Sequence, residues 1–192
     1  MAIKEFNGHL KSDQEITLGI DQSLTGFALS AVSVATPSEH MTWVYKSPYK
    51  GVQRLADIME WLDVKIEDLL FERLTIKDIA MEGTVLASQS ALVLGELSAT
   101  VKLTLWNFFD DHLKTPLQIP PMTLKKYATG KGTAKKQEML LQIYKRWGIE
   151  FNDDNAADAY SLARLAGGHA ISAIETQIVE QIKDPKYRDT IG

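Results

Sequence analysis

The pattern of apolar and polar positions predicts strands in the first quarter of the chain. Residues 16–35 form two apolar runs joined by a turn at Gly26, and residues 41–49 form a third run. Short apolar runs that contain β-branched and aromatic side chains and are bounded by turn residues are typical of strands. Three such runs in succession predict an antiparallel meander.

After residue 50 the pattern changes to helical spacing. Apolar residues recur every three or four positions from Gly51 to about Phe71, which predicts an amphipathic helix, and the segment TIKDIAMEG reads as a buried strand. The remaining expected elements are a long helix capped by Ser88 or Ser90 and ending near Asp111, a short strand in PLQIPP, a helix over 134–147, and a helix over 155–166 that is capped by Asp153 or Asp154 and interrupted at Gly167 and Gly168.

This order of elements predicts an α/β fold. We expect a mixed five-stranded sheet, with three antiparallel strands followed by parallel ones, and helices on both faces. The chain has 192 residues, enough for one domain with a substantial core but not for two. We expect residues 15–170 to form this domain, residues 1–14 to be a polar N-terminal tail, and residues 171–192 to form a C-terminal helix and tail.

Carboxylates stand at three points of this framework where a charge is costly. Asp21 ends the apolar run LGID, and Glu82 ends the apolar run IAME just before Gly83 lets the chain turn. Asp154 and Asp158 are four residues apart at the start of the last core helix, so they can share one face of it. Each acid alone also fits a turn or a helix cap, but together they predict one acidic pocket.

An acidic pocket of this kind is typical of a metal-dependent phosphodiesterase. The chain has no cysteine, so any metal must be held by oxygen or histidine ligands, which favours hard cations. Grouped carboxylates bind Mg²⁺ or Mn²⁺, and a pair of such ions promotes phosphodiester hydrolysis. We therefore expect Mg²⁺ as the cofactor, with Mn²⁺ able to substitute for it.

The overall charge conceals a basic segment. A formal net charge of -4 gives no general support for nucleic-acid binding. Between residues 125 and 146, however, seven basic residues stand against one acid, around a Gly-Lys-Gly turn whose backbone can approach phosphate closely. The candidates for DNA contacts are Lys125, Lys126, Lys131, Lys135 and Lys136, whereas Lys145 and Arg146 fit a solvated helix face equally well.

Several segments together resemble the RuvC family of Holliday junction resolvases. GIDQSLTGFAL is similar to the family's block with the catalytic Asp, here Asp21, and IAMEG is similar to the block with its Glu, here Glu82. LGELSATVKLTL, PMTLKKYATGKGTAKKQEML and NAADAYSLA follow in the family's order, so the resemblance covers residues 17–166. It implies an RNase H-like fold, divalent-metal dependence, cleavage of four-way junctions and other branched DNA, and action as a homodimer. It also implies that Lys125 and Lys136 contact phosphate near the metals.

Two features depart from the family pattern. The family commonly has a metal-binding acid three residues before the final Asp, and this chain has Asn155 there. Asn155 could ligate through its carboxamide oxygen, Asp154 could replace it as a ligand, or Asn155 could be a substitution that disables cutting. The loop after Glu82 carries Val85 and Leu86, where the family often has an aromatic that stacks at the branch point.

Two other functions compete with junction cleavage. A non-cleaving junction-binding protein would keep the fold and the lysines but would have lost activity at Asn155. An actin-like ATPase or sugar kinase has a similar GIDxSxT loop, but it needs two such domains and this chain has room for one. No apolar run approaches the roughly 20 residues of a membrane span, and the polar start lacks the core of a secretory signal, so we expect a cytoplasmic protein without membrane contact.

The long helix also offers a surface for dimerisation. Apolar residues wrap more than one side of it, which predicts either a homodimer contact or a helix sandwiched inside the monomer. Resolving a two-fold junction takes two symmetric cuts, which favours the dimer. The apolar residues concerned are Leu92, Val93, Leu97, Val101, Leu103, Leu105, Trp106 and Phe109.

Overall fold

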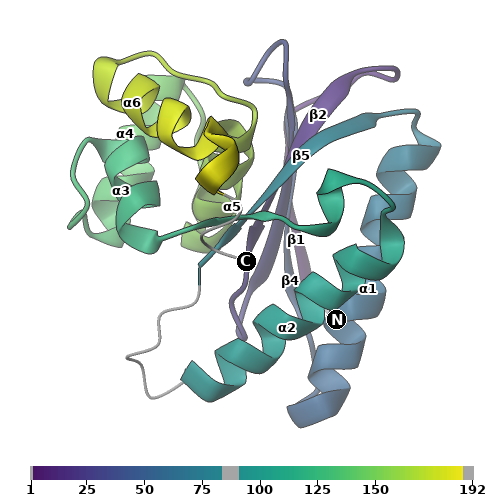
Figure 1. Ribbon diagram of the computed structural model, residues 1–192. Coiled ribbons are helices and arrows are strands. Elements are labelled where there is room, and N and C mark those ends of the chain that lie inside the picture. The colour runs from purple at the N-terminus through teal and green to yellow at the C-terminus, as the bar shows by residue number, and fades with distance from the viewer. Residues whose placement is uncertain (1, 84–90, 188–192) are drawn as a thin grey trace.

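A mixed sheet forms the centre of the computed structural model, which describes residues 2–83 and 91–187 (Figure 1). Its strands, in chain order, are β1 (Ala2–Asn7), β2 (Glu15–Asp21), β3 (Phe27–Ser33), β4 (His40–Lys46), β5 (Thr75–Glu82) and β6 (Leu117–Ile119). In space they follow the order β1-β4-β3-β2-β5-β6. The pairs from β1 to β2 are antiparallel, and β5 and β6 continue the sheet in parallel with β2. The predicted mixed sheet is confirmed.

Helices cover both faces of the sheet (Figure 1). On one side lie α1 (Gly51–Phe71) and α2 (Ala91–Phe108), followed by the short 3₁₀ turn η1 (His112–Lys114). On the other side lie α3 (Pro121–Thr129), α4 (Lys136–Trp147), α5 (Asp154–Ala166) and α6 (Ala173–Lys183). The helical spacing did not predict α3, a nine-residue helix that starts at a proline, whose fixed φ suits the first helical position. Within the described ranges, no helix combines the length and hydropathy needed to cross a membrane.

The prediction of five strands is wrong by one, because β1 lies in the segment expected to be a polar tail. It pairs antiparallel with β4 as an edge strand, with Lys4 opposite Val44. The ring of Phe6 packs edge-on against Phe151, with 5.4 Å between ring centroids, and Lys4 Nζ donates to the Asp153 carboxylate at 3.0 Å. An edge strand is partly exposed to solvent and can contain many polar residues. The polar composition of residues 2–7 therefore gave no apolar run that would predict a strand.

Small side chains on one face of the sheet bring α5 close to the strands. Thr17 Oγ1 donates to the carbonyl oxygen of Ala163 at 2.7 Å, so β2 is bonded directly to the backbone of α5. A Cβ atom added to Gly19 would overlap the Ala159 carbonyl oxygen and the Ala163 nitrogen. The helix therefore rests on bare strand backbone, which sets its first turn beside the end of β2.

Candidate active site

Asp21 and Glu82 are neighbours at the edge of the sheet where β2 and β5 end. The two strands are parallel with Ile20 paired to Met81, so the next residue of each strand falls side by side. Asp21 is 4% exposed, and its side chain is hydrogen-bonded to that of Glu82. The two strand-end acids of the sequence prediction thus meet in one place.

The first turn of α5 adds two more carboxylates. Asp153 is the N-cap residue, since its side chain accepts from the backbone nitrogens of Asn155 at 3.1 Å and Ala156 at 3.4 Å. This settles which acid caps the helix and leaves Asp154 free to face the site. Asp154 and Asp158 line one cavity of about 430 Å³ together with Glu82.

Burial and neighbouring carboxylates raise the pKa values of three acids in this cluster. Burial, followed by the charges of Glu82 and Asp158, raises the pKa of Asp21 well above its ordinary value. Burial raises the pKa of Asp158 to about 7, with Glu82 and Asp154 adding to the effect. The pKa of Glu82 is raised by burial as well, although Lys125 and Lys136 act against the rise. Buried like charges without enough counter-charge shift pKa values in this direction.

The predicted DNA-contact lysines lie beside the acids and on the neighbouring helices α3 and α4. Lys136 pairs with Asp154, and Lys125 lines the same cavity from α3. Lys131 lies in the turn between α3 and α4, 3.8 Å from the Glu138 carboxylate, and Lys126 and Lys135 are exposed. All five lysines therefore belong to α3, α4 and the turn between them, a unit called the basic arm below.

Asn155 shares this cavity with Lys125 and Lys136. It lines the cavity, and a Cβ atom on Gly26 would stand 2.6 Å from its Nδ2. The carboxamide therefore packs against the turn between β2 and β3, while Asp154 faces the basic arm. Val85 and Leu86, expected near the branch point of DNA, lie outside the described residues.

Sequence reasoning missed Gln22, the residue that ties the two strand ends together. Its Nε2 donates to the carbonyl oxygen of Glu82 at 2.5 Å, and the side chain is 7% exposed. The charge of Asp21 marks it within an apolar run, whereas a glutamine after a strand has no distinctive sequence signal.

Gly19 does have a sequence signal that was missed. A glycine between apolar strand residues often marks a close approach of another backbone.

The donor set suits a hard divalent cation. Carboxylate oxygens are the ligands that Mg²⁺ and Mn²⁺ prefer, and a bound cation would favour the charged forms of acids whose pKa values burial raises. Among the residues that the structure describes, no three acidic or histidine side chains are already arranged as a metal site. The ion pair with Lys136 opposes such convergence for Asp154. The ligand roles therefore remain predictions.

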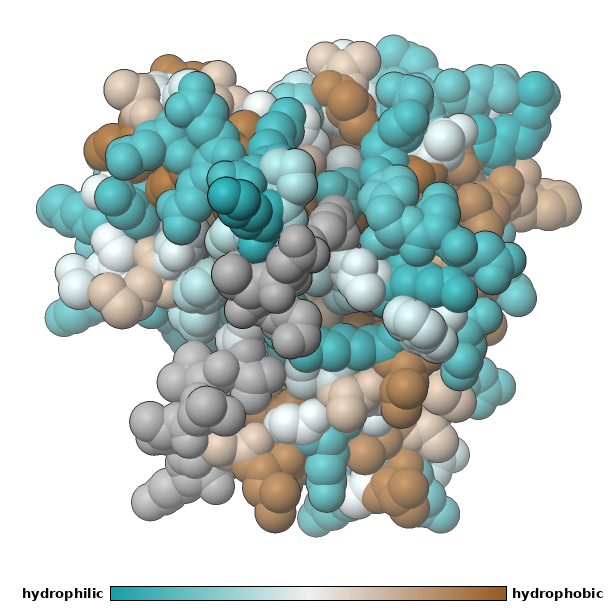
Figure 2. All heavy atoms as spheres, in the orientation of Figure 1, coloured by the Kyte–Doolittle hydropathy of each residue, from teal (hydrophilic) through white to brown (hydrophobic). Residues whose placement is uncertain are grey.

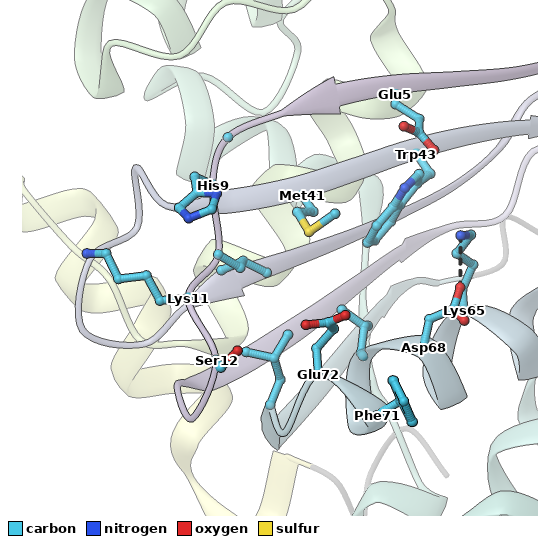
Figure 3. A pocket seen from close by; sticks show the side chains of 14 residues that line it. Glu5, His9, Lys11, Ser12, Met41, Trp43, Lys65, Asp68, Phe71 and Glu72 are labelled. Carbon is cyan, nitrogen blue, oxygen red and sulfur yellow. Dashed lines mark hydrogen bonds and ion pairs between the residues drawn. The ribbon is translucent and has the colours of Figure 1, made fainter.

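A second cavity lies far from these acids in the fold. It measures about 600 Å³ between β1, β4 and the end of α1, with Trp43 and Met41 on the sheet side and Phe71 on the helix side (Figure 3). Lys65 and Asp68 form an ion pair at its edge, at 3.1 Å. It shares no described lining residue with the cavity at the ends of β2 and β5.

The layers, the strand order and the carboxylates at the ends of β2 and β5 define an RNase H-like α/β domain. Two structures of RuvC from Thermus thermophilus have this fold. One, with 20% identity and a TM-score of 0.60, covers 87% of this chain and 96% of that chain. The other, in complex with a Holliday junction substrate, has 20% identity and a TM-score of 0.59 and covers 77% and 90%. The yeast mitochondrial Holliday junction resolvase Ydc2 has 17% identity and a TM-score of 0.51 and covers 95% and 85%.

No family model and no curated protein sequence matches the chain. The similarity is therefore one of fold, and the RNase H-like fold expected from the sequence is confirmed by it.

Proposed function

We propose that this protein is a structure-selective endonuclease that cleaves Holliday junctions and other branched DNA by divalent-metal-dependent hydrolysis of a phosphodiester bond. The observation that carries the proposal is the meeting of Asp21, Glu82, Asp154 and Asp158 beside two lysines, on a fold shared with RuvC. A cluster of acids next to cationic side chains suits a substrate that is a phosphate and needs a metal ion to react.

Each part of the site would have a separate task. The four carboxylates would hold Mg²⁺ or Mn²⁺, which activates water and stabilises the leaving oxygen in phosphodiester hydrolysis. Lys125 and Lys136 would bind the phosphates that flank the scissile bond and offset their charge. The exposed lysines of the basic arm would follow the DNA backbone away from the site, where each contact releases counterions.

A junction-binding protein without cleavage is the second candidate. It is favoured by one observation, the neutral Asn155 where the RuvC pattern has an acid. Asp154 is the acid available to replace it, since it lines the same cavity and is not used as the helix cap. Asn155→Asp separates the two candidates, since an inactive wild type whose Asn155→Asp variant cuts would be a disabled nuclease. If the wild type cuts, Asp154→Asn tests the replacement: it should be nearly as damaging as Asp158→Asn if Asp154 is the ligand, and mild if the Asn155 carboxamide is.

The direct test is incubation with a labelled four-way junction and Mg²⁺ or Mn²⁺. We expect paired cuts near the branch point, none in EDTA, and little cutting of a linear duplex of the same sequence. Asp21→Asn and Glu82→Gln should abolish cleavage and leave junction binding largely intact. Normal cleavage by either variant would reject the assignment of the site.

We also propose that the active species is a homodimer. The described part of α2 has Leu97, Val101 and Leu105 buried in the core, but Leu103 and Trp106 stay 61% and 53% exposed. Figure 2 shows brown, apolar side chains low on this face, where Figure 1 places α2. An apolar surface of this kind on a helix favours a protein contact.

A further inference from the structure

A buried ion pair joins the last turn of α4 to the first turn of α6. Arg146, near the end of α4, pairs with Glu175 in the first turn of α6. The Glu175 side chain is fully buried, and that of Arg146 is 19% exposed. Arg146 therefore points into the protein and does not lie on the solvated helix face that its sequence context allowed.

Arg146 also closes the end of α3. Its Nη1 donates to the carbonyl oxygens of Tyr127 at 3.2 Å and Ala128 at 2.8 Å, and its Nη2 donates to Ser172 Oγ at 3.1 Å. Carbonyls in the last turn of a helix have no partner within that helix, so the guanidinium satisfies two of them. Only a forked, planar donor group can serve these acceptors and a carboxylate together.

Glu175 is fixed in turn by the start of α6. Its Oε2 accepts from the backbone nitrogen of Ile171 at 2.6 Å. Ser172, which Arg146 also contacts, is the N-cap residue of α6 and accepts from the Glu175 nitrogen at 3.3 Å. The first turn of α6 is thus a rigid support for Arg146.

The other end of this chain of contacts leads to the DNA-contact candidates. The hydroxyl of Thr129 donates to the carbonyl oxygen of Lys125 at 2.8 Å and accepts from the backbone nitrogen of Lys131 at 3.0 Å. Gly130 ends α3 with a φ of 82°, which turns the chain toward α4. The carbonyls that Arg146 holds belong to the same last turn, so fixing them also fixes Lys125 and the turn with Lys131.

We propose that Arg146 and Glu175 are positioning residues of the DNA-binding site. They hold the end of α3 and the Gly-Lys-Gly turn against α4 and α6, so that Lys125 and Lys131 present their charges to the DNA backbone in fixed places. The inference rests on the proposed function only where it names DNA, since the restraint on α3 is a property of the protein alone. If the pair served only global stability, breaking it would raise amide hydrogen exchange throughout the domain and not only in α3 and the turn after it.

The test uses Arg146→Lys, which keeps the charge opposite Glu175 but lacks the fork. We expect amide hydrogen exchange over residues 121–131 to rise at least about tenfold, with β2 and β5 unchanged, since loss of a local restraint opens a local unit. Glu175→Gln should act in the same direction, and the double variant should be no worse than Arg146→Lys, because both changes break one network. The matched control is Lys145→Gln, an exposed neighbour, which should leave exchange over residues 121–131 unchanged.

DNA binding supplies the second measurement, made with a labelled four-way junction in EDTA. We expect Arg146→Lys to lower the slope of log affinity against log salt by about one, as one phosphate contact is lost without loss of a charge. Unchanged exchange over 121–131 would overturn the proposal, and so would an unchanged salt slope or exchange that rises equally in every element. A wild type that does not cut DNA would reject the proposed nuclease function. It would not affect this test, because hydrogen exchange and binding in EDTA do not depend on cleavage.

Discussion

At the scale of single residues, the candidate site consists of carboxylates that are buried where apolar strands and a helix meet. A carboxylate at the end of an apolar strand is costly unless a cation or hydrogen bonds offset it. Asp21, Glu82 and Asp158 share one small region, and each has a raised pKa because of burial. Groups that destabilise the folded chain in this way are typical of functional sites.

The first prediction concerns Asp158→Asn in EDTA. The pKa of Asp158 is about 7 in the folded protein and near 3.8 in the unfolded chain, so the folded state binds the extra proton between these values. The free energy of unfolding therefore falls as the pH rises from about 4 to about 7, and the loss is complete above that. Removing the charge should raise stability at pH ~8 by roughly 2 kcal/mol, since each pKa unit is worth ~1.4 kcal/mol and solvent screens part of the effect.

Urea denaturation of both proteins at pH ~5 and pH ~8 measures this difference. The gain should be smaller at the lower pH, where Asp158 is largely protonated. Adding Mn²⁺ should stabilise the wild type more than the variant, because a cation that binds only the folded state stabilises it. A variant that is no more stable than the wild type at pH ~8, and that responds to Mn²⁺ as strongly as the wild type, would remove Asp158 from the proposed metal site.

The sequence predicted the acids better than their supports. Asp21 and Glu82 were recognisable because a charge ends an apolar run in each case. The choice between Asp153 and Asp154 as the cap stayed open, because both precede the helix and only the observed hydrogen bonds separate them. The pairing of Arg146 with Glu175 could not be predicted, since 29 residues separate them and both residue types are ordinarily exposed.

At the scale of elements, the site depends on how closely α5 lies on β2. Asp21 belongs to the strand and Asp158 to the helix, so their separation is set by the contact between the two backbones at Gly19. Helical and strand periodicity predicted both elements. Periodicity carries no information on how closely two elements pack, which is why the convergence of the acids remained an expectation until the fold was known.

Gly19→Ala tests this contact. The added Cβ would overlap the Ala159 carbonyl oxygen and the Ala163 nitrogen, so α5 must move or the fold must strain. We expect a loss of about 3 kcal/mol in stability, at the upper end for overpacked cores. Cleavage by the fraction that remains folded should fall too, because Asp158 would be displaced from Asp21.

The matched control is Gly95→Ala, in the described part of α2. A Cβ on Gly95 meets nothing within 4 Å, so the same chemical change should stabilise the protein by up to about 1 kcal/mol through helix propensity. Chemical denaturation of both variants decides the matter. Equal effects of the two substitutions would mean that the close approach at Gly19 is not what places α5.

The edge strand β1 gives a second prediction at this scale. A loose tail would tolerate Phe6→Ala, whereas the packing of Phe6 on Phe151 predicts a loss of roughly 2 kcal/mol, below the cost for a fully buried Phe. Ile3→Ala, at a position that is 43% exposed, is the control and should cost far less. Thermal unfolding would show the difference, and equal melting temperatures for Phe6→Ala and the wild type would place residues 2–7 outside the stable sheet.

At the scale of the whole molecule, the proposed function requires two cuts, whereas each chain has one candidate site. Two-fold DNA requires two cuts related by symmetry, and a two-fold dimer supplies both sites at once. The described part of α2 uses one face for the core and leaves Leu92, Val93, Leu103 and Trp106 exposed. In the alternative, a helix packed only inside the monomer, these side chains would remain in contact with solvent.

Leu103→Lys should therefore convert a dimer into monomers, because a charge on an apolar interface must be desolvated when the two copies meet. Sedimentation at micromolar concentration without DNA measures the change, with Leu141→Lys on α4, also at an exposed leucine, as the control that should remain dimeric. On a plasmid with an extruded cruciform, the wild type should give linear product and Leu103→Lys mainly nicked circles, since each monomer keeps its own acids but cuts only one strand in each binding event. A strictly monomeric wild type that linearises the plasmid in one binding event would reject the proposed dimer. The acids of a single chain would then have to make both cuts.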